Sequence, residues 1–188
     1  PLYGYEEFKA LQEAIQKKKL PVQVAGCIDS QKCHLMCAAA QGIPNRLIIT
    51  HNELRAKEIY EDCRLYGREV YLYPAKDIIF FSADIHGNAI IKERLKILRR
   101  IMEKEPVTVV TTIDGGMDKV LPLNYLWENC IQIKNSGVLD LELLQKQLVK
   151  LGYKHQTQVE GAGEFAVRGG IIDIFPLTDE VPVRIELW

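Results

Sequence analysis

Hydrophobic and polar positions alternate in a repeating order over the first two thirds of the chain. Short apolar runs predict four strands, at residues 22–26, 47–50, 70–73 and 107–111. Apolar residues spaced three or four apart predict helices around these strands, at residues 5–18, 31–41, 52–67 and 88–104. Strands that alternate with helices form parallel sheets through right-handed crossovers. Residues 1–122 are therefore expected to form an α/β domain with a parallel sheet.

The pattern changes after Pro122. Ile131 and Ile133 predict a strand, and Asp140 is expected to cap a helix with a leucine stripe. Three short runs with alternating or apolar positions predict further strands, at residues 153–159, 165–175 and 183–188. Strands that cluster after one helix favour an antiparallel sheet. Residues 123–188 are thus expected to form a small α+β domain.

Charge supports a boundary near Pro122 and limits the function classes. Residues 1–122 carry 18 basic and 16 acidic side chains, whereas residues 123–188 carry 6 and 9. The formal net charge of the 188 residues is −1, which does not indicate a globally basic nucleic-acid binder. The chain begins at Pro1 and stops inside the last predicted strand, so we expect a piece of a longer protein.

The remaining composition is typical of a globular protein without a membrane partner. Hydrophobic residues make up 47% and charged residues 26%, and no apolar run approaches the roughly 18 residues of a membrane span. The five cysteines are an odd number, and no secretory signal precedes them. Reduced thiols in a cytoplasmic protein are the expected state.

Metal and hydrolase sites are not indicated. Cys33 and Cys37 could share a helix face, but no second cysteine or histidine pair follows at zinc spacing, so buried thiols are expected and no metal. The four histidines are scattered along the chain. No catalytic residue is predicted.

Residues 26–33 partly match the phosphate-loop pattern G-x-x-x-x-G-K-[ST] between a predicted strand and helix. Gly26 and Lys32 are in place, whereas Gln31 replaces the second glycine and Cys33 replaces the hydroxyl residue. Glycines allow the backbone to wrap a phosphate, and magnesium prefers hard oxygen ligands to a thiol. We expect a degenerate nucleotide loop without a cofactor. A working ATP site and an accidental match are the alternatives.

Two segments resemble known repair proteins. Residues 47–60 resemble the strand and helix that follow the phosphate loop in the excision repair protein UvrB, and residues 163–176 resemble a signature shared by UvrB and bacterial transcription-repair coupling factors (Mfd). Residues 73–95 also fit the coupling-factor pattern, and the lost phosphate loop favours the N-terminal UvrB-like module of that family. The stretch after Tyr73 is too short for the long aromatic hairpin with which UvrB clamps DNA.

The resemblance implies a binding function. In these families the small domain docks the damage-recognition subunit UvrA, while ATP-driven, magnesium-dependent translocase motifs further along the coupling factor displace RNA polymerase from DNA. This chain would be the non-catalytic recruiting part, acting when the polymerase stalls at a lesion.

Residues of the small domain are the candidates for UvrA binding. Arg168 is the expected anchor, since arginine offers a planar fork of five donors and is frequent at interfaces. Lys154 and His155 are expected to extend its surface, Glu164 to meet a basic group of the partner, and Phe165 is a further candidate contact. Phe165 alternates with Val167, and one of the two is expected to pack inward. UvrB carries a second arginine where Ala166 stands here, so part of its arginine cluster is missing.

Two other functions remain open from the sequence. A working ATPase or helicase fragment of the UvrB type would bind nucleotide at Lys32. A DNA-binding module would use the basic residues 17–19 and 99–100. Strongly salt-dependent affinity for DNA would favour the second function.

Overall fold

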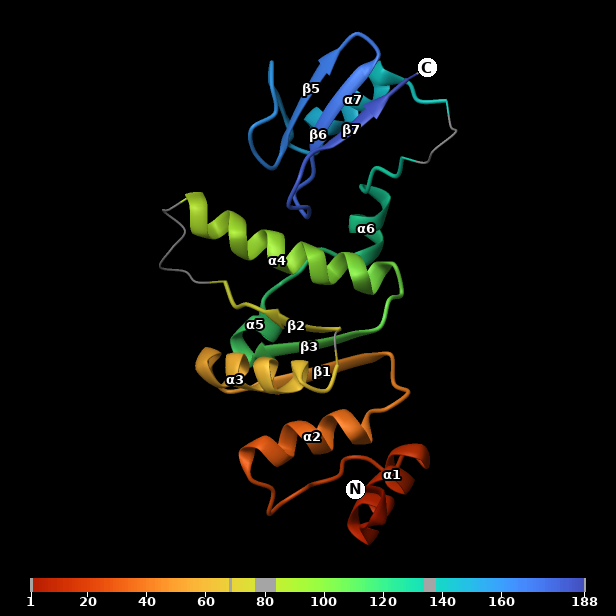
Figure 1. The fold of residues 1–188 in the computed structure, drawn as a ribbon, viewed down its shortest axis with the longest axis vertical. Helices are drawn as coiled ribbons and strands as arrows, with labels where there is room; N and C mark the ends of the chain where they lie inside the picture. Colours follow the sequence, from red (N-terminus) through yellow and green to blue (C-terminus); the bar gives the residue numbers. More distant parts are fainter. Residues whose placement is uncertain (1, 68, 77–83, 134–137, 188) are drawn as a thin grey trace. The chain divides into compact units, whose positions relative to one another are not determined.

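The fold is taken from a computed structural model, which describes residues 2–67, 69–76, 84–133 and 138–187 (Figure 1). The chain divides into two compact units. The first consists of residues 1–90 and 97–118, and the second of residues 91–96 and 119–188. The sequence also predicts a loop at residues 75–87 with exposed aromatic residues at Phe80 and Phe81, but these two residues lie outside the described part of the chain.

The first unit is built on a parallel three-stranded sheet. Its strands are β1 (Asn45–Thr50), β2 (Val70–Tyr73) and β3 (Val107–Thr112), in the spatial order β1-β3-β2. The register pairs Ile48 and Leu72 with Val110 from either side. All six residues of β3 are buried, as expected for a central parallel strand covered on both faces.

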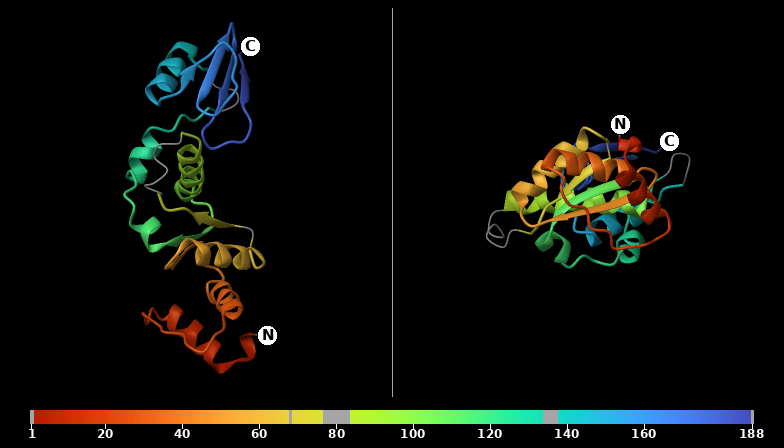
Figure 2. Two further views of the ribbon diagram at one scale, coloured as in Figure 1. Left: turned by 90° about the vertical axis from the view of Figure 1, so that its left-hand side faces the viewer. Right: turned by 90° about the horizontal axis from the view of Figure 1, so that it is seen from below.

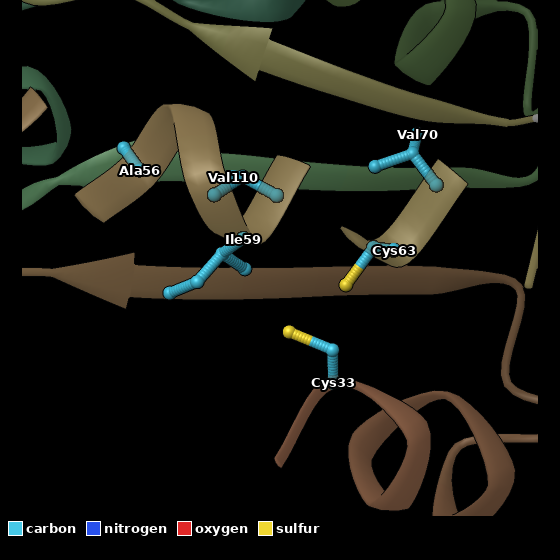
Figure 3. Packing of buried hydrophobic residues seen from close by; sticks show 6 residues of the cluster. All are labelled: Cys33, Ala56, Ile59, Cys63, Val70 and Val110. Atoms are coloured by element: carbon cyan, nitrogen blue, oxygen red, sulfur yellow. The ribbon is translucent and has the colours of Figure 1, made fainter. Parts of the chain in front are cut away.

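Helices cover both faces of β3. On one face lie α2 (Asp29–Ala39) and α3 (Glu53–Arg64), and on the other lies the C-terminal part of α4 (Asp84–Met102). The α2 and α3 side shares one apolar cluster, shown in Figure 3, whose buried members are Cys33, Ala56, Ile59, Cys63, Val70 and Val110. The α4 side packs Ile97 and Ile101 against Tyr73, Val107 and Val109. The first unit therefore has two cores, one on each side of its sheet.

Most of the predicted elements of this unit are confirmed. The structure adds η1 (Leu2–Gly4) before α1 (Glu6–Gln16), and α5 (Ile113–Met117) follows β3. Asn52, at the start of the helix predicted over residues 52–67, caps α3: its side chain accepts a hydrogen bond of 2.8 Å from the Arg55 backbone N–H.

The prediction of a strand at residues 22–26 is wrong. These residues form no strand, and Val22 and Val24 are 40% and 49% exposed. Alternating valines favour an extended backbone, but a strand also needs a neighbour to receive its ladder hydrogen bonds. No described strand supplies that partner, because β1 pairs only with β3.

The second unit combines one helix with a four-stranded sheet. Its sheet has the order β4 (Lys154–His155), β5 (Glu164–Arg168), β6 (Ile171–Phe175) and β7 (Val183–Glu186). Helix α7 (Leu141–Lys150) covers one face of this sheet (Figure 2), and Asp140 caps it through a 3.0 Å hydrogen bond from the Leu143 N–H. The buried residues of this core are Leu144, Leu148, Phe165, Ile172 and Ile174.

Three expectations for this unit need correction. The sheet is mixed rather than wholly antiparallel, since β4 runs parallel to β5. The run at residues 165–175 forms two strands joined by a turn, in which Gly169 has φ +60°. Residues 131–133 form no strand, and the helix α6 (Leu123–Glu128) was not predicted.

The return from β4 to β5 explains the parallel pairing. The Glu164 carboxylate accepts hydrogen bonds from the backbone N–H groups of Glu160 and Gly161, at 2.9 and 3.0 Å. These bonds shape the loop between the strands and place the start of β5 beside Lys154. The spacing of apolar residues does not predict this loop, because a polar side chain, Glu164, holds it in place.

Candidate partner-binding surface and the phosphate-loop segment

The segment that resembles a phosphate loop leads directly into α2. Gly26 has φ +83°, a conformation that favours glycine, and the helix begins at Asp29. The side-chain Oε1 of Gln31 accepts a hydrogen bond of 3.3 Å from the Ile28 N–H. Gln31 thus closes the first turn of the helix itself, using a backbone donor that lies beside the loop.

The charges of this segment are paired with one another. One Asp29 carboxylate oxygen lies 3.2 Å from Lys32 Nζ and 3.0 Å from Arg55 Nη2. A carboxylate in the first turn of a helix occupies the electrostatically favoured position of an anion and repels a second one. The lysine that would meet a phosphate is engaged by Asp29 instead, so this arrangement opposes phosphate binding.

Cys33, at the hydroxyl position of the pattern, is fully buried. Its thiol belongs to the core between α2 and α3, where burial raises its pKa (Figure 3). A thiol in that place is not presented to a magnesium ion beside the loop. Among the described residues, no group of three or more histidine, cysteine, aspartate or glutamate side chains is arranged to hold a metal.

Three of the five basic residues expected for a DNA-binding module are paired with carboxylates. Lys17 pairs with Glu13 one helical turn away. Arg99 lies 3.0 Å from a carboxylate oxygen of Glu103, and Arg100 forms ion pairs with Glu69 and Glu105. These side chains are already neutralised locally, which weakens the case for phosphate contacts.

The second unit presents a sheet face that α7 does not cover. Residues paired across neighbouring strands point to the same side of a sheet. The register therefore places several charged side chains together on the face opposite α7, which we call the outer sheet face: Lys154, Glu164, Arg168, Asp173 and Arg184. No helix from the described part of this unit lies on that face (Figure 2).

Arg168 lies at the end of β5 on the outer sheet face and is exposed. Its Nη2 donates a hydrogen bond of 2.6 Å to the Thr157 carbonyl oxygen. One backbone acceptor leaves most of the five guanidinium donors to other groups. The bond orients the Arg168 guanidinium group and leaves its other N–H donors for a partner, which suits an interface anchor.

Asp173 and Arg184 form a two-pronged ion pair beside Arg168. The Arg184 Nε and Nη2 atoms lie 2.7 and 2.9 Å from the two Asp173 carboxylate oxygens. These hydrogen bonds lower the pKa of Asp173, and the charge of Arg168 adds to the effect. This pair was missed from the sequence because it depends on the register of β6 with β7, although both residues lie in alternating segments.

Glu164 has a mainly structural role on the outer sheet face. Hydrogen bonds from the Glu160 and Gly161 backbone lower its pKa, with a smaller contribution from Lys154. Its carboxylate is therefore turned toward the loop after β4. Lys154 is exposed on the neighbouring strand, next to Glu164 in the register.

The two aromatic candidates lie on the other face. Phe165 is only 1% exposed and packs in the core with α7, and Val167 is partly buried on the same side. Both residues pack inward, since residues two apart on a strand share a face. The expectation that His155 extends the surface of Arg168 is wrong: its ring stacks on Phe165, with 4.9 Å between centroids.

Comparison with known proteins first defines the class of the second unit. Residues 131–188 match the family model of the UvrB interaction domain. This match includes α7 and all four strands of the mixed sheet. The class of domain implied by residues 163–176 is thereby confirmed.

Whole-chain similarity then points to particular proteins. The chain is 30% identical to the transcription-repair-coupling factor of Bacillus subtilis, in a match of 187 residues that covers 97% of this chain. It is 32% identical over 152 residues to that of Staphylococcus aureus and 31% identical over 144 residues to that of Staphylococcus epidermidis, covering 79% and 76% of this chain. The resemblance to the transcription-repair coupling factors is confirmed.

This chain is much shorter than those relatives. It spans 16% of the Bacillus protein, 13% of the Staphylococcus aureus protein and 12% of the Staphylococcus epidermidis protein. Within the described residues, no helix has the length and apolar character needed to cross a membrane.

Proposed function

We propose that this chain is the UvrA-recruiting part of a transcription-repair coupling factor. The small domain binds UvrA, and the chain itself carries out no bond chemistry. The observation that carries this proposal is the outer sheet face, where an exposed and oriented Arg168 stands in a domain that matches the UvrB interaction family.

The proposed contact surface consists of Arg168, Lys154 and the Asp173–Arg184 pair. Alternating positive and negative groups select a partner whose charges are complementary, and this favours specificity and a fast encounter. Glu164 supports the surface by holding the loop that contains Thr157 and Gly161. Phe165 and His155 support it from the core side of the sheet.

We further propose that residues 26–33 are a degenerate phosphate loop, so that the chain needs no nucleotide or magnesium. The pairing of Lys32 with Asp29, and the burial of Cys33, support this loss. In the longer protein, ATP and magnesium belong to translocase motifs elsewhere, and contacts with RNA polymerase and DNA also belong to the protein as a whole.

Calorimetric titration with purified UvrA tests the recruiting function. The wild-type chain should bind UvrA, and titration with ATP and magnesium under the same conditions should give no binding heat. A folded chain that binds ATP but not UvrA would favour the ATPase alternative. Strong binding to duplex DNA that weakens steeply with salt, without UvrA binding, would favour the DNA-binding module.

A further inference from the structure

Three cysteines converge where α2 packs against α3 in the first unit. Cys33 and Cys37 lie one turn apart on α2, and Cys63 lies near the end of α3. Cys33 and Cys63 are fully buried, with their sulfurs pointing toward each other in Figure 3. Cys37 is partly buried against the same cluster. The proposed binding of UvrA uses none of these thiols.

A cavity of about 460 Å³ is lined by two of the three cysteines. Its lining includes Cys37, Cys63, His34, Arg46, Tyr66 and Thr108. Cys33 does not line the cavity. This volume falls within the range of about 300–1,000 Å³ that is usual for small-molecule sites.

The environment of Cys37 favours its thiolate. A side-chain hydrogen bond from Cys63 lowers the pKa of Cys37 to about 7, and the positive charge of Arg46 acts in the same direction. The same hydrogen bond and burial raise the pKa of Cys63. The two cysteines thus have different roles in a reactive dithiol. Cys37 is the thiolate that attacks, and Cys63 is the protonated thiol that reacts second.

We propose that Cys37 and Cys63 form a dithiol site that reacts with low-molecular-weight disulfides entering this cavity. The Cys37 thiolate attacks one sulfur of the disulfide, whose S–S bond breaks and releases one thiolate. The product is a mixed disulfide on Cys37.

Cys63 completes the exchange. Its thiol first gives its proton to the released thiolate. The Cys63 sulfur then attacks the Cys37 sulfur and displaces the second half of the small disulfide. That half leaves as a thiolate and takes a proton from water. Two protein thiols are oxidised to one disulfide, and one small disulfide is reduced to two thiols. The hydrogen bond to the Cys37 thiolate is the main cause of the raised pKa of Cys63. Formation of the mixed disulfide removes that cause and frees Cys63 to react.

Cys33 provides an internal control for this site. It is as buried as Cys63, burial raises its pKa, and it has no access to the cavity. Cys33 also contacts Cys63. The expected bridge is nevertheless Cys37–Cys63, because these two cysteines line the cavity through which the small disulfide enters. Such a bridge joins α2 to α3 covalently within the first unit.

Peptide mapping after oxidation tests the proposal. The reduced protein is treated with oxidised glutathione at pH 7, quenched with acid, and its free thiols are blocked with an alkylating reagent. We expect a disulfide between the peptides of Cys37 and Cys63, with Cys33 free. Cys63→Ala should stop at a glutathionyl group on Cys37, whereas Cys33→Ala should form the same bridge as the wild type. Oxidation confined to Cys130 or Cys27, or a Cys33–Cys63 bridge, would overturn the proposal.

The pH dependence of alkylation is the second measurement. The rate at Cys37 with iodoacetamide should be half-maximal near pH 7, the value of about 7 set by the Cys63 hydrogen bond. In Cys63→Ala the midpoint should move toward the roughly 8.5 of an ordinary thiol, and Cys63→Ser should retain part of the shift because a hydroxyl also donates. Circular dichroism checks that each variant is folded. A wild-type midpoint at about 8.5 or above contradicts the proposal even where a variant fails to fold.

Discussion

The inner strands of the two sheets differ in how many of their faces are covered. In the first unit, β3 is buried at every position, with α2 and α3 on one side and α4 on the other. In the second unit, β6 alternates between fully and partly buried residues, and α7 is the one helix among the described residues that packs on its sheet. The central strand β3 has no face left for a partner, although the edge strand β1 exposes Leu47 and Ile49. The second sheet keeps the charged outer sheet face.

The charged residues follow the same division. Near residues 26–33 of the first unit, Asp29 is paired with Lys32 and Arg55, and the buried Cys33 completes the core. On the outer sheet face, Arg168 is exposed and bonded to a single carbonyl. In the first unit these charged side chains pair with one another at the start of α2. In the second unit, Arg168 is exposed and held in one direction.

The largest expected effect concerns the single core of the second unit. Phe165→Ala removes a ring that is 1% exposed, and such truncations cost about 3–5 kcal/mol. Urea unfolding followed by tryptophan fluorescence measures this loss, since Trp127 and Trp188 both lie after residue 122. Phe175→Ala is the control, because Phe175 is only half-buried. Equal losses in the two variants would show that α7 and its face do not form the main core.

A smaller effect is expected where α5 follows β3 in the first unit. A Cβ added at Gly115 would lie 2.5 Å from Thr111 Oγ1, which donates a hydrogen bond to the Tyr73 carbonyl. Gly115→Ala should therefore lower the free energy of unfolding by about 1–3 kcal/mol, as overpacking usually does. The matched Gly116→Ala meets its nearest atom at 3.8 Å and should be nearly neutral. Thermal unfolding followed by circular dichroism compares them, and similar melting temperatures would refute this close packing.

The smallest effect concerns the ion pair on the outer sheet face. The Arg184 hydrogen bond lowers the pKa of Asp173 in the folded protein below its unfolded value of about 3.9. The pair therefore stabilises the fold above about pH 4, and this stabilisation is lost as the pH falls through the lower folded pKa. The contribution should be below about 1 kcal/mol, because Arg184 is largely exposed.

Urea titrations at a series of acidic pH values measure this contribution. The wild type should lose more free energy of unfolding on acidification than Asp173→Asn, and Arg184→Ala should remove the same difference. Parallel pH profiles for the three proteins would mean that the ion pair does not stabilise the folded state.

Local signals in the sequence predicted much of the fold. Asn52 and Asp140 marked the starts of α3 and α7, and both caps are present. The strand expected at residues 22–26 failed because strand formation depends on a distant partner as well as on alternation. Helix α6 was missed because it has only six residues, too few to show a helical repeat, and none of them is buried.

The candidate site was only partly predictable for the same reason. Burial along β5 does not alternate strictly, because Phe165 and Ala166 are both buried. The exposure of Arg168 follows from its place at the end of the strand, before Gly169. The stacking of His155 on Phe165 and the pairing of Asp173 with Arg184 depend on the register between strands. The lowered pKa of Cys37 depends on the packing of two helices.

Calorimetric titration of UvrA with wild type, Arg168→Ala and Lys146→Ala tests the central claim most directly. Lys146 is an exposed cation on α7, on the covered side of the sheet, and serves as the charge control. The account predicts that Arg168→Ala weakens binding by more than about 2 kcal/mol in a folded protein, whereas Lys146→Ala binds as the wild type does. Equal binding by all three proteins would contradict the assignment of the outer sheet face.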